Sequence, residues 1–316
     1  MSALLIFWLI QAPCAWAAAV QPPAQSGNPR TVNLEHRGRV RTYSVYIPSH
    51  LAEAKVPAVL VLHGGGGNGK QVMRMTGFHL KAEQEGFIAV FPDGTASLQD
   101  RFLVWNAGHC CASAMRQGVD DVGFIRDLIQ SLVRDYPVDP ERIFVTGISN
   151  GAMMAHRLGR ELSDLIAAIA PVAGGMFGDE KQPARPVSAL LINGGQDTLV
   201  PVAGGKSSLD RKRIFKAFDA PLAPASFAVH YWTGADGCAS GPVQEGDVDR
   251  RVAVDRYEGC REQTEVVFTL VEEIGHAWPG GAGGRRENDG SASTLDATTA
   301  IWDFFKGKRK QIAPAK

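Results

Sequence analysis

The strongest chemical motif in the chain is a serine flanked by glycines. Ser149 lies in the run G-I-S-N-G, and no other serine has a glycine both two positions before it and two positions after it. Residues 142–148 form an apolar segment typical of a strand, and residues 151–162 follow as a predicted helix. Such a serine sits on a sharp turn, because side chains at the glycine positions would clash with the neighbouring strand and helix. We therefore predict that Ser149 is a nucleophile presented above a sheet.

A serine nucleophile needs a base, and His276 is the best candidate. When such a serine follows a strand, the acid and the base come later in the chain, in the order serine, acid, histidine. His276 lies in a glycine-rich loop directly after a predicted strand at 264–271, at the end of a strand where α/β sheets keep their active sites. The alternative, His230, falls inside a predicted helix at 223–233 and is interpreted as a structural or surface histidine.

The same argument selects Asp197 as the acid that orients the base. It lies in the loop N-G-G-Q-D, which follows a predicted strand at 187–192. The other aspartates between the serine and the histidine that we considered lie in or beside helices. Aspartate is also common in turns, so an ordinary turn residue is the competing interpretation.

A tetrahedral intermediate needs two backbone N–H donors for its oxyanion. We expect one from Asn150, which follows the nucleophile, and the other from the glycine-rich loop H-G-G-G-G-N-G after the predicted strand at 57–62. A phosphate-binding loop is the competing interpretation, but Gly69-Lys70 is followed by glutamine rather than serine or threonine. His63 precedes the nucleophile, and we interpret it as a structural hydrogen-bonding residue.

Short apolar runs alternate with helical stretches along most of the chain, which predicts a mostly parallel sheet with helices on both faces. A strand pair with a turn at Arg37-Gly38 comes first, within residues 31–47. The further strands are expected at 57–62, 87–91, 142–148, 167–173, 187–192 and 264–271. The helices are expected at 119–136, 151–162, 223–233 and 294–305.

The two ends of the chain differ in composition from this domain, which we place at residues 31–306. Residues 1–19 resemble a signal peptide, with a short apolar run and small residues after it, and a retained tail is the alternative. Residues 20–30 are predicted to be a disordered linker, and residues 307–316 a solvated basic tail. The chain is thus expected to be secreted, either extracellular or periplasmic, without stable membrane insertion.

Charge and cysteine content exclude some classes of protein. With 33 Lys and Arg against 33 Asp and Glu, the chain offers no electrostatic case for binding nucleic acid. Beyond the signal peptide there are four cysteines, without the spacing of a zinc site, so no metal is expected. An even number in an exported chain favours disulfides, and we predict one between Cys238 and Cys260. Whether the adjacent Cys110 and Cys111 pair or stay free is left open.

Several segments together resemble the polyhydroxybutyrate depolymerase-like esterases, which include feruloyl and acetyl xylan esterases of the carbohydrate esterase 1 type. The resemblance implies an α/β-hydrolase fold and a serine esterase that works through an acyl-enzyme with no cofactor. The segments are LVLHGGGGNG from Leu60, FPDGTAS from Phe91, WNAGHCC from Trp105, VDDVGFI from Val119, GISNGAMMAHRL from Gly147, GGQDTLVPVAGG from Gly194 and GHAWPGG from Gly275.

The resemblance also assigns roles to single residues. It implies the same Ser149, Asp197 and His276, and it makes Gly65 the second oxyanion donor beside Asn150. Trp105 and Trp278 match aromatic positions near the cleft of the family, which implies contact with substrate; core packing is the alternative. Asp120 and Asp121 also match a family motif, and we interpret them as residues at a helix N-terminus rather than as catalysts.

The expected partner is an ester: a soluble ester, an oligoester or a plant cell-wall ester. Only the short basic tail follows the last predicted helix, which favours soluble substrates over crystalline polyester. A serine peptidase of the same fold is the alternative within enzymes, because ester and peptide cleavage share this chemistry. A non-catalytic binding module would need a broken triad, and all three positions are intact.

Overall fold

The fold is known from a computed structural model, which describes residues 27–96, 102–211, 217–246, 251–282 and 293–311. The expected signal peptide, most of the linker and the last residues of the basic tail lie outside these ranges. Among the described residues, no helix combines the length and the apolar character that crossing a bilayer requires.

A ten-stranded sheet forms the centre of the molecule, in the order β1-β2-β4-β3-β5-β6-β7-β10-β9-β8. The strands from β4 to β10 in this order are parallel, whereas β1, β2, β9 and β8 add antiparallel edges. The strands are β1 (Arg30–His36), β2 (Arg39–Tyr46), β3 (Val56–Leu62), β4 (Ile88–Pro92), β5 (Val138–Ile148), β6 (Ala168–Val172), β7 (Ser188–Gly194), β8 (Ser240–Gly246), β9 (Val252–Glu258) and β10 (Val266–Val271).

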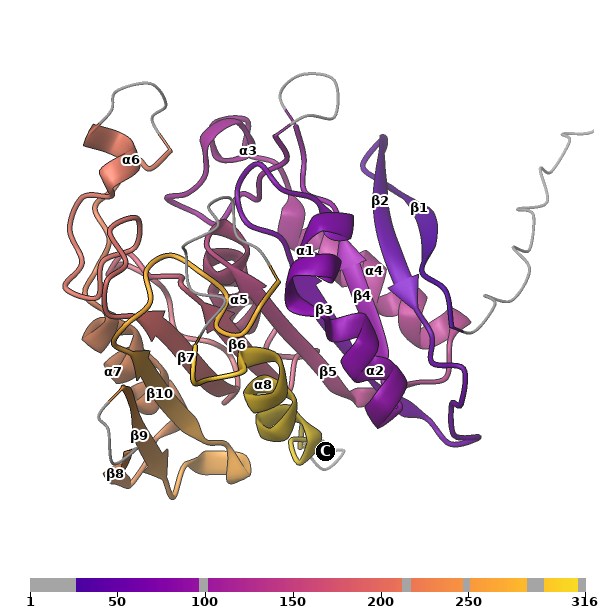
Figure 1. The fold of residues 1–316 in the computed structure, drawn as a ribbon. Helices are drawn as coiled ribbons and strands as arrows, with labels where there is room; N and C mark the ends of the chain where they lie inside the picture. The colour runs from indigo at the N-terminus through magenta and orange to yellow at the C-terminus, as the bar shows by residue number, and fades with distance from the viewer. Residues whose placement is uncertain (1–26, 97–101, 212–216, 247–250, 283–292, 312–316) are drawn as a thin grey trace, which may run out of the picture.

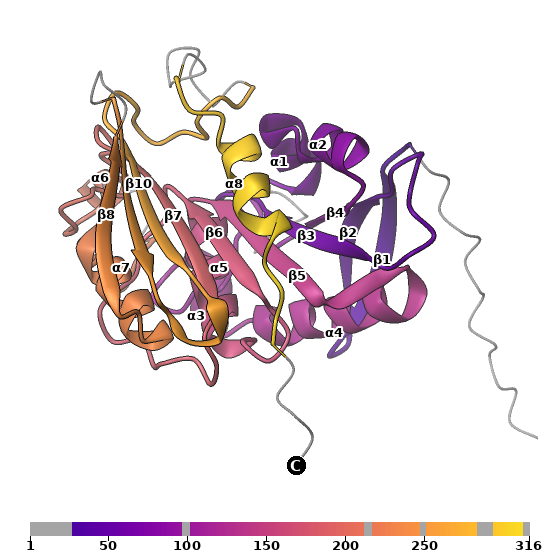
Figure 2. The same cartoon turned by 90° about the horizontal axis from the view of Figure 1, so that it is seen from below.

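Helices cover both faces of this sheet, with α1, α2 and α8 on one face and α4, α5 and α7 on the other (Figures 1 and 2). Each face has its own apolar core, because the parallel strands are buried on both sides. The helices are α1 (Gly69–Thr76), α2 (Phe78–Glu85), α3 (Ala112–Arg116), α4 (Asp121–Asp135), α5 (Asn150–Glu161), α6 (Ser208–Arg211), α7 (Ala225–Asp236) and α8 (Ala297–Lys306), with a short 3-10 helix at Arg261–Gln263.

The structure confirms the α/β-hydrolase fold class and the main predicted elements, with shifts of a few residues at their ends. The hairpin β8–β9 and the helices α1 and α2 are not among the predicted elements. Most side chains of β9 are exposed or half-buried. An edge strand of this kind has no buried apolar run, so its pattern resembles a polar loop.

Two disulfides lie among the described residues. Cys238 pairs with Cys260 and so closes the base of the β8–β9 hairpin. Cys110 pairs with its neighbour Cys111, which answers the question that the sequence left open. Disulfides of this kind persist in oxidising compartments.

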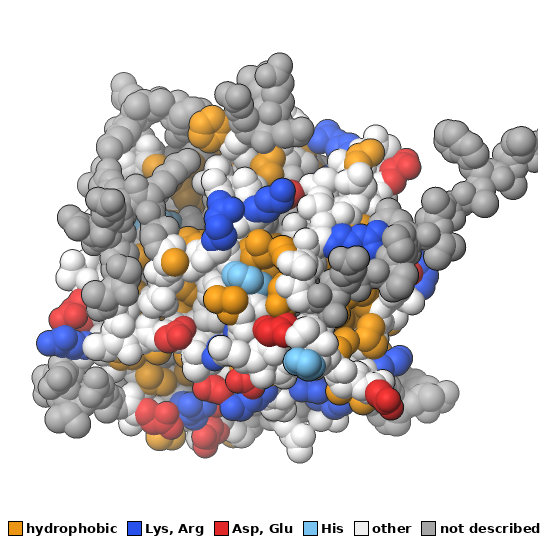
Figure 3. All heavy atoms as spheres, turned by 45° about the vertical axis from the view of Figure 1, so that its right-hand side comes forward, with side chains coloured by type: hydrophobic (Ala, Val, Ile, Leu, Met, Phe, Trp, Pro, Cys, Tyr) orange, Lys and Arg blue, Asp and Glu red, His pale blue; other side chains and the backbone are white. Residues whose placement is uncertain are grey.

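The structure describes residues 307–311 of the predicted basic tail, and these lie at the surface, where they form ion pairs. Arg309 contacts Asp139 at 2.9 Å and also pairs with Glu141, while Lys308 pairs with Glu265. These carboxylates lie in β5 and directly before β10, far apart in sequence, so the run of basic residues alone could not reveal them. On the face shown in Figure 3, charges of both signs are mixed along the lower rim.

Asp236, at the end of α7, supports a prediction about pH. The side chain is fully buried and accepts a hydrogen bond from the Val187 N–H at 3.0 Å. Burial raises its pKa from 3.8 to about 7. When the pKa of an acid is higher in the folded state than in the unfolded state, the free energy of unfolding falls as the pH rises above the unfolded-state pKa. The fall continues until the pH reaches the folded-state pKa.

Asp236→Asn is therefore expected to raise the free energy of unfolding by about 4 kcal/mol at pH 8 and to change it little at pH 4. Urea unfolding at the two pH values measures the difference. Asp303→Asn, on the exposed face of α8, is the matched control and should show no such contrast. Equal effects of Asp236→Asn at both pH values would contradict the titration argument.

Candidate active site

Ser149 occupies a strained turn between β5 and α5. Its backbone has φ +58° and ψ −121°, a conformation that residues other than glycine rarely adopt. The flanking glycines are required by packing. A Cβ at Gly147 would come within 2.8 Å of the Leu62 Cβ, and one at Gly151 within 2.5 Å of the His63 carbonyl oxygen. The glycines let this turn pack against the end of β3, and the side chain of Ser149 remains partly exposed.

Asp197 and His276 meet where two neighbouring parallel strands end. Asp197 follows β7 and His276 follows β10, and these strands pair along their whole shared length. The His276 Nδ1 lies 2.7 Å from an oxygen of Asp197. Because an ionised carboxylate can only accept, Nδ1 carries the proton and Nε2 is left as an acceptor. The close approach of the two loops needs Gly194, where a Cβ would lie 2.5 Å from the Ile274 carbonyl oxygen.

The carboxylate of Asp197 is held rigidly. Its other oxygen accepts hydrogen bonds from the backbone N–H groups of Leu199 and Val200, both at 2.8 Å. The Asp197 side chain is fully buried, while that of His276 is 17% exposed. The buried carboxylate thus fixes the ring while the ring stays accessible, which is what an orienting acid and a base require.

The glycine-rich loop after β3 lies against the serine turn. A Cβ on Gly64 would lie 3.4 Å from the Ser149 Cβ, and one on Gly65 would lie 3.8 Å from the Asn150 Cβ. The backbone N–H groups of Gly65 and Asn150 make no hydrogen bond to other residues in the described ranges. The structure thus brings the two expected oxyanion donors close to each other and to Ser149.

His63 is a structural residue, as the sequence analysis predicted. Its Nδ1 donates to the Gly64 carbonyl at 2.8 Å, and its Nε2 accepts from the Gly94 N–H at 2.9 Å. Burial lowers the pKa of His63 to about 4, so the ring is neutral at physiological pH. The remaining candidate base, His230, lies exposed on α7.

The expectation that Trp105 and Trp278 contact substrate is wrong. Trp105 is fully buried and Trp278 is only 3% exposed, so neither presents a ring face to a ligand. Each indole N–H is already satisfied, in Trp105 by the His63 carbonyl and in Trp278 by the Thr298 hydroxyl, both at 3.0 Å. Core packing is therefore the correct interpretation. Each ring removes a large apolar surface from water, and its one polar group has a hydrogen-bond partner.

Asp120 and Asp121 lie at the start of α4, as expected. The side chain of Asp120 caps the helix by accepting from the Gly123 N–H at 2.9 Å. Asp121 is fully buried and forms an ion pair with Arg41 at 2.8 Å, a partner that the sequence analysis did not identify. Arg41 lies on β2, and neither helical nor strand periodicity indicates such a contact between distant elements.

Comparison with known proteins shows the family of this chain. Residues 41–212, just over half of the chain, match the family described as esterase PHB depolymerase. The chain belongs to this esterase family. A feruloyl esterase B of Piromyces equi is 30% identical over 230 residues, which cover 71% of this chain and 37% of that protein. A putative esterase of Nocardia uniformis subsp. tsuyamanensis is 29% identical over 290 residues, covering 85% of this chain and 80% of the relative.

The fold of this chain is also seen in solved structures. An acetyl xylan esterase from Aspergillus awamori superposes with a TM-score of 0.59 at 15% identity, covering 88% of this chain and 99% of that one. At such low identity the likeness shows the fold alone. The chain spans little more than a third of the length of the Piromyces enzyme.

One hollow among the described residues is lined by residues other than the candidate triad. It has a volume of about 600 Å³ and lies beside His109 and residues 177–184, and neither Ser149 nor His276 lines it. Hydrogen bonds to Asp179 and Asp219 raise the pKa of His109 there. Within the described ranges, no group of three or more His, Cys, Asp or Glu side chains could hold a metal ion.

Proposed function

We propose that this chain is a secreted serine esterase that hydrolyses carboxylic esters, with Ser149 as nucleophile, His276 as base and Asp197 as orienting acid. One observation carries the proposal. The 2.7 Å hydrogen bond between Asp197 and His276 forms at the ends of β7 and β10, on the same edge of the sheet as the strained turn at Ser149. The two disulfides among the described residues support the proposed secretion.

The proposed reaction proceeds through an acyl-enzyme. The Ser149 Oγ attacks the ester carbonyl carbon while its proton passes to the His276 Nε2. The carbonyl oxygen becomes an oxyanion, which accepts from the N–H groups of Gly65 and Asn150. His276 then gives the proton to the departing alcohol. A water molecule, deprotonated by His276, releases the acid from Ser149 and restores the enzyme.

For the substrate we propose a soluble ester, an oligoester or a plant cell-wall ester. Support comes from the relatives, whose names include feruloyl esterase and acetylxylan esterase. The burial of Trp105 and Trp278 removes the reason, drawn from stacking, to favour an aromatic acyl group. Acetyl, feruloyl and 3-hydroxybutyryl esters therefore stand as equal candidates.

A substrate panel tests the proposal. The mature protein is expected to hydrolyse at least one of short acyl esters, methyl ferulate, acetylated xylan and 3-hydroxybutyrate oligomers, with initial rates measured by release of acid. Amide and peptide substrates with matching acyl groups serve as controls. Turnover of the peptides without turnover of any ester would identify a peptidase of the same fold and contradict the proposal.

A further inference from the structure

We propose that the segment 103–106 is a positioning element for the oxyanion hole, and that the Trp105 indole N–H links its two halves. This inference rests on the proposed function. Trp105 touches no reacting atom, because it is fully buried. Its role is to fix the distance between the loop that carries Gly65 and the turn that carries Asn150.

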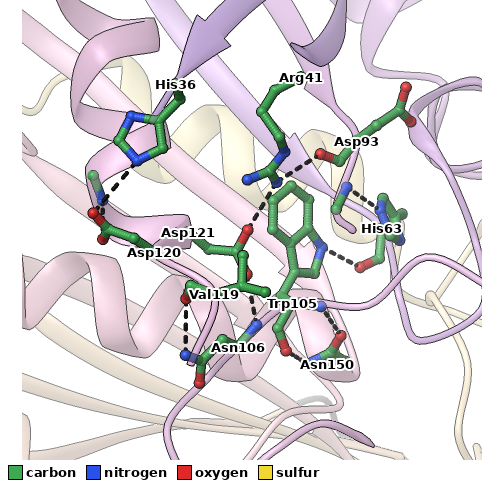
Figure 4. A network of polar contacts seen from close by, with 12 residues as sticks. His36, Arg41, His63, Asp93, Trp105, Asn106, Val119, Asp120, Asp121 and Asn150 are labelled. Atoms are coloured by element: carbon green, nitrogen blue, oxygen red, sulfur yellow. Dashed lines mark hydrogen bonds and ion pairs between the residues drawn. The ribbon is translucent and has the colours of Figure 1, made fainter. Parts of the chain in front are cut away.

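The hydrogen bonds of Trp105 reach both halves of the oxyanion hole (Figure 4). Its backbone N–H donates to the Asn150 side-chain oxygen at 2.7 Å, and its carbonyl accepts from the Asn150 side-chain NH₂ at 3.0 Å. Its indole N–H donates to the His63 carbonyl at 3.0 Å. The Trp105 backbone thus holds the side chain of Asn150, while the Trp105 ring holds the loop that carries Gly65.

Neighbouring residues strengthen the link to the glycine loop. The Leu103 carbonyl accepts from the Gly66 N–H at 2.8 Å, one residue beyond the proposed donor. A Cβ on Gly65 would lie 3.9 Å from a methyl group of Val104. Gly65 therefore lies between His63 and Gly66, and both of these residues are hydrogen-bonded to the segment 103–106. These two bonds limit how far the Gly65 N–H can move. Glycine backbones need such external support because they have the most conformational freedom.

A buried ion pair anchors the other end of the segment. The Asn106 N–H donates to one oxygen of Asp121 at 2.8 Å, and Arg41 binds the other oxygen at 2.8 Å. The Asn106 side chain also donates to the Val119 carbonyl at 2.9 Å. Arg41 and Asp121 are almost completely buried, and Figure 4 shows their ion pair together with the hydrogen bond from Asn106 to Asp121. Both charges are compensated, so the anchor connects β2 and α4 to the segment without leaving a bare buried charge.

The physical consequence concerns the transition state. Donors that are fixed before reaction stabilise the oxyanion strongly because they need no reorganisation as charge develops. Loosening them weakens an interaction that is made only in the transition state, which lowers kcat and leaves KM nearly unchanged. A purely structural role would lower stability alone.

Trp105→Phe tests this role, because it removes the indole N–H, together with the volume of one ring, and leaves the backbone bonds to Asn150. We expect kcat to fall about ten-fold with KM changed less than three-fold, and affinity for a boronic acid inhibitor to fall by about the same factor as kcat. The boronic acid forms a tetrahedral adduct on Ser149 that resembles the intermediate.

Trp232→Phe is the matched control. Trp232 is also fully buried, and its indole N–H donates to the His156 Nδ1 at 3.0 Å, far along α5 from the serine. It should lose thermal stability comparable to that of Trp105→Phe and keep wild-type kcat and inhibitor affinity. Should Trp105→Phe fail to fold, Asn150→Ala decides by the same measurements, because it keeps the backbone donor and deletes both bonds to Trp105.

The outcomes separate the two proposals. If the wild type is active and Ser149→Ala is inactive, but Trp105→Phe matches Trp232→Phe in kcat and inhibitor affinity, the positioning role is wrong and the esterase assignment stands. If the wild type hydrolyses no ester, or if Ser149→Ala stays active, the proposed function itself fails.

Discussion

Ser149→Ala is expected to lower kcat for ester hydrolysis by about 10⁴-fold or more, to the level that binding and the oxyanion donors alone support. The substitution deletes one oxygen from a partly exposed side chain, so the fold should remain intact. Thermal unfolding checks the fold, and initial rates on the most active ester of the panel measure the loss. The strained turn at Ser149 supports this expectation, because such strain is retained where the surrounding structure serves a function.

Ser163→Ala provides the matched control. Ser163 is buried, and it follows α5 at the end opposite to Ser149. It should retain wild-type kcat, so that a large loss in Ser149→Ala alone reports on the nucleophile. Activity of Ser149→Ala within ten-fold of the wild type would show that another residue attacks the ester.

His276→Ala is expected to be nearly as damaging as the serine substitution, with a loss of kcat of roughly 10⁴-fold or more. Without the imidazole, the Ser149 hydroxyl has no base to take its proton. The double variant should be little worse than either single variant, because members of a triad act as a unit. Rates of the two single variants and the double variant, measured on one ester, test both statements.

His230→Ala is the control for the loss of a histidine. His230 is exposed on α7, so its removal should change kcat by less than about two-fold and stability by less than about 0.5 kcal/mol. A severe loss in His230→Ala together with a mild one in His276→Ala would reverse the assignment of the base.

The parallel centre of the fold could be predicted because its strands are buried on both faces. The strand β3 is buried at every position, and such an apolar run is visible in the sequence itself. The hairpin β8–β9 could not be predicted in this way. Its residues lie at a sheet edge, and their pairing with β10 depends on a surface that only the folded sheet provides.

The candidate triad could be predicted from order and placement, since the ends of parallel strands gather at one edge of a sheet. Ser149, Asp197 and His276 each follow a strand, and each was selected on that ground. The roles of Trp105 and Trp278 could not be decided in the same way. A tryptophan suits a core and a cleft equally well, and only burial distinguishes the two.

The sequence by itself determined which residues stand at the ends of the parallel strands, because hydrophobic periodicity and glycine spacing are local properties of the chain. The tertiary structure alone decided how residues far apart along the chain pair with each other. It places Arg41 on Asp121 and the basic tail on Asp139 and Glu141. It also puts the Trp105 indole on the His63 carbonyl. Such contacts follow from the packing of whole elements, and a charge or an indole N–H accepts any suitable partner that packing brings within reach.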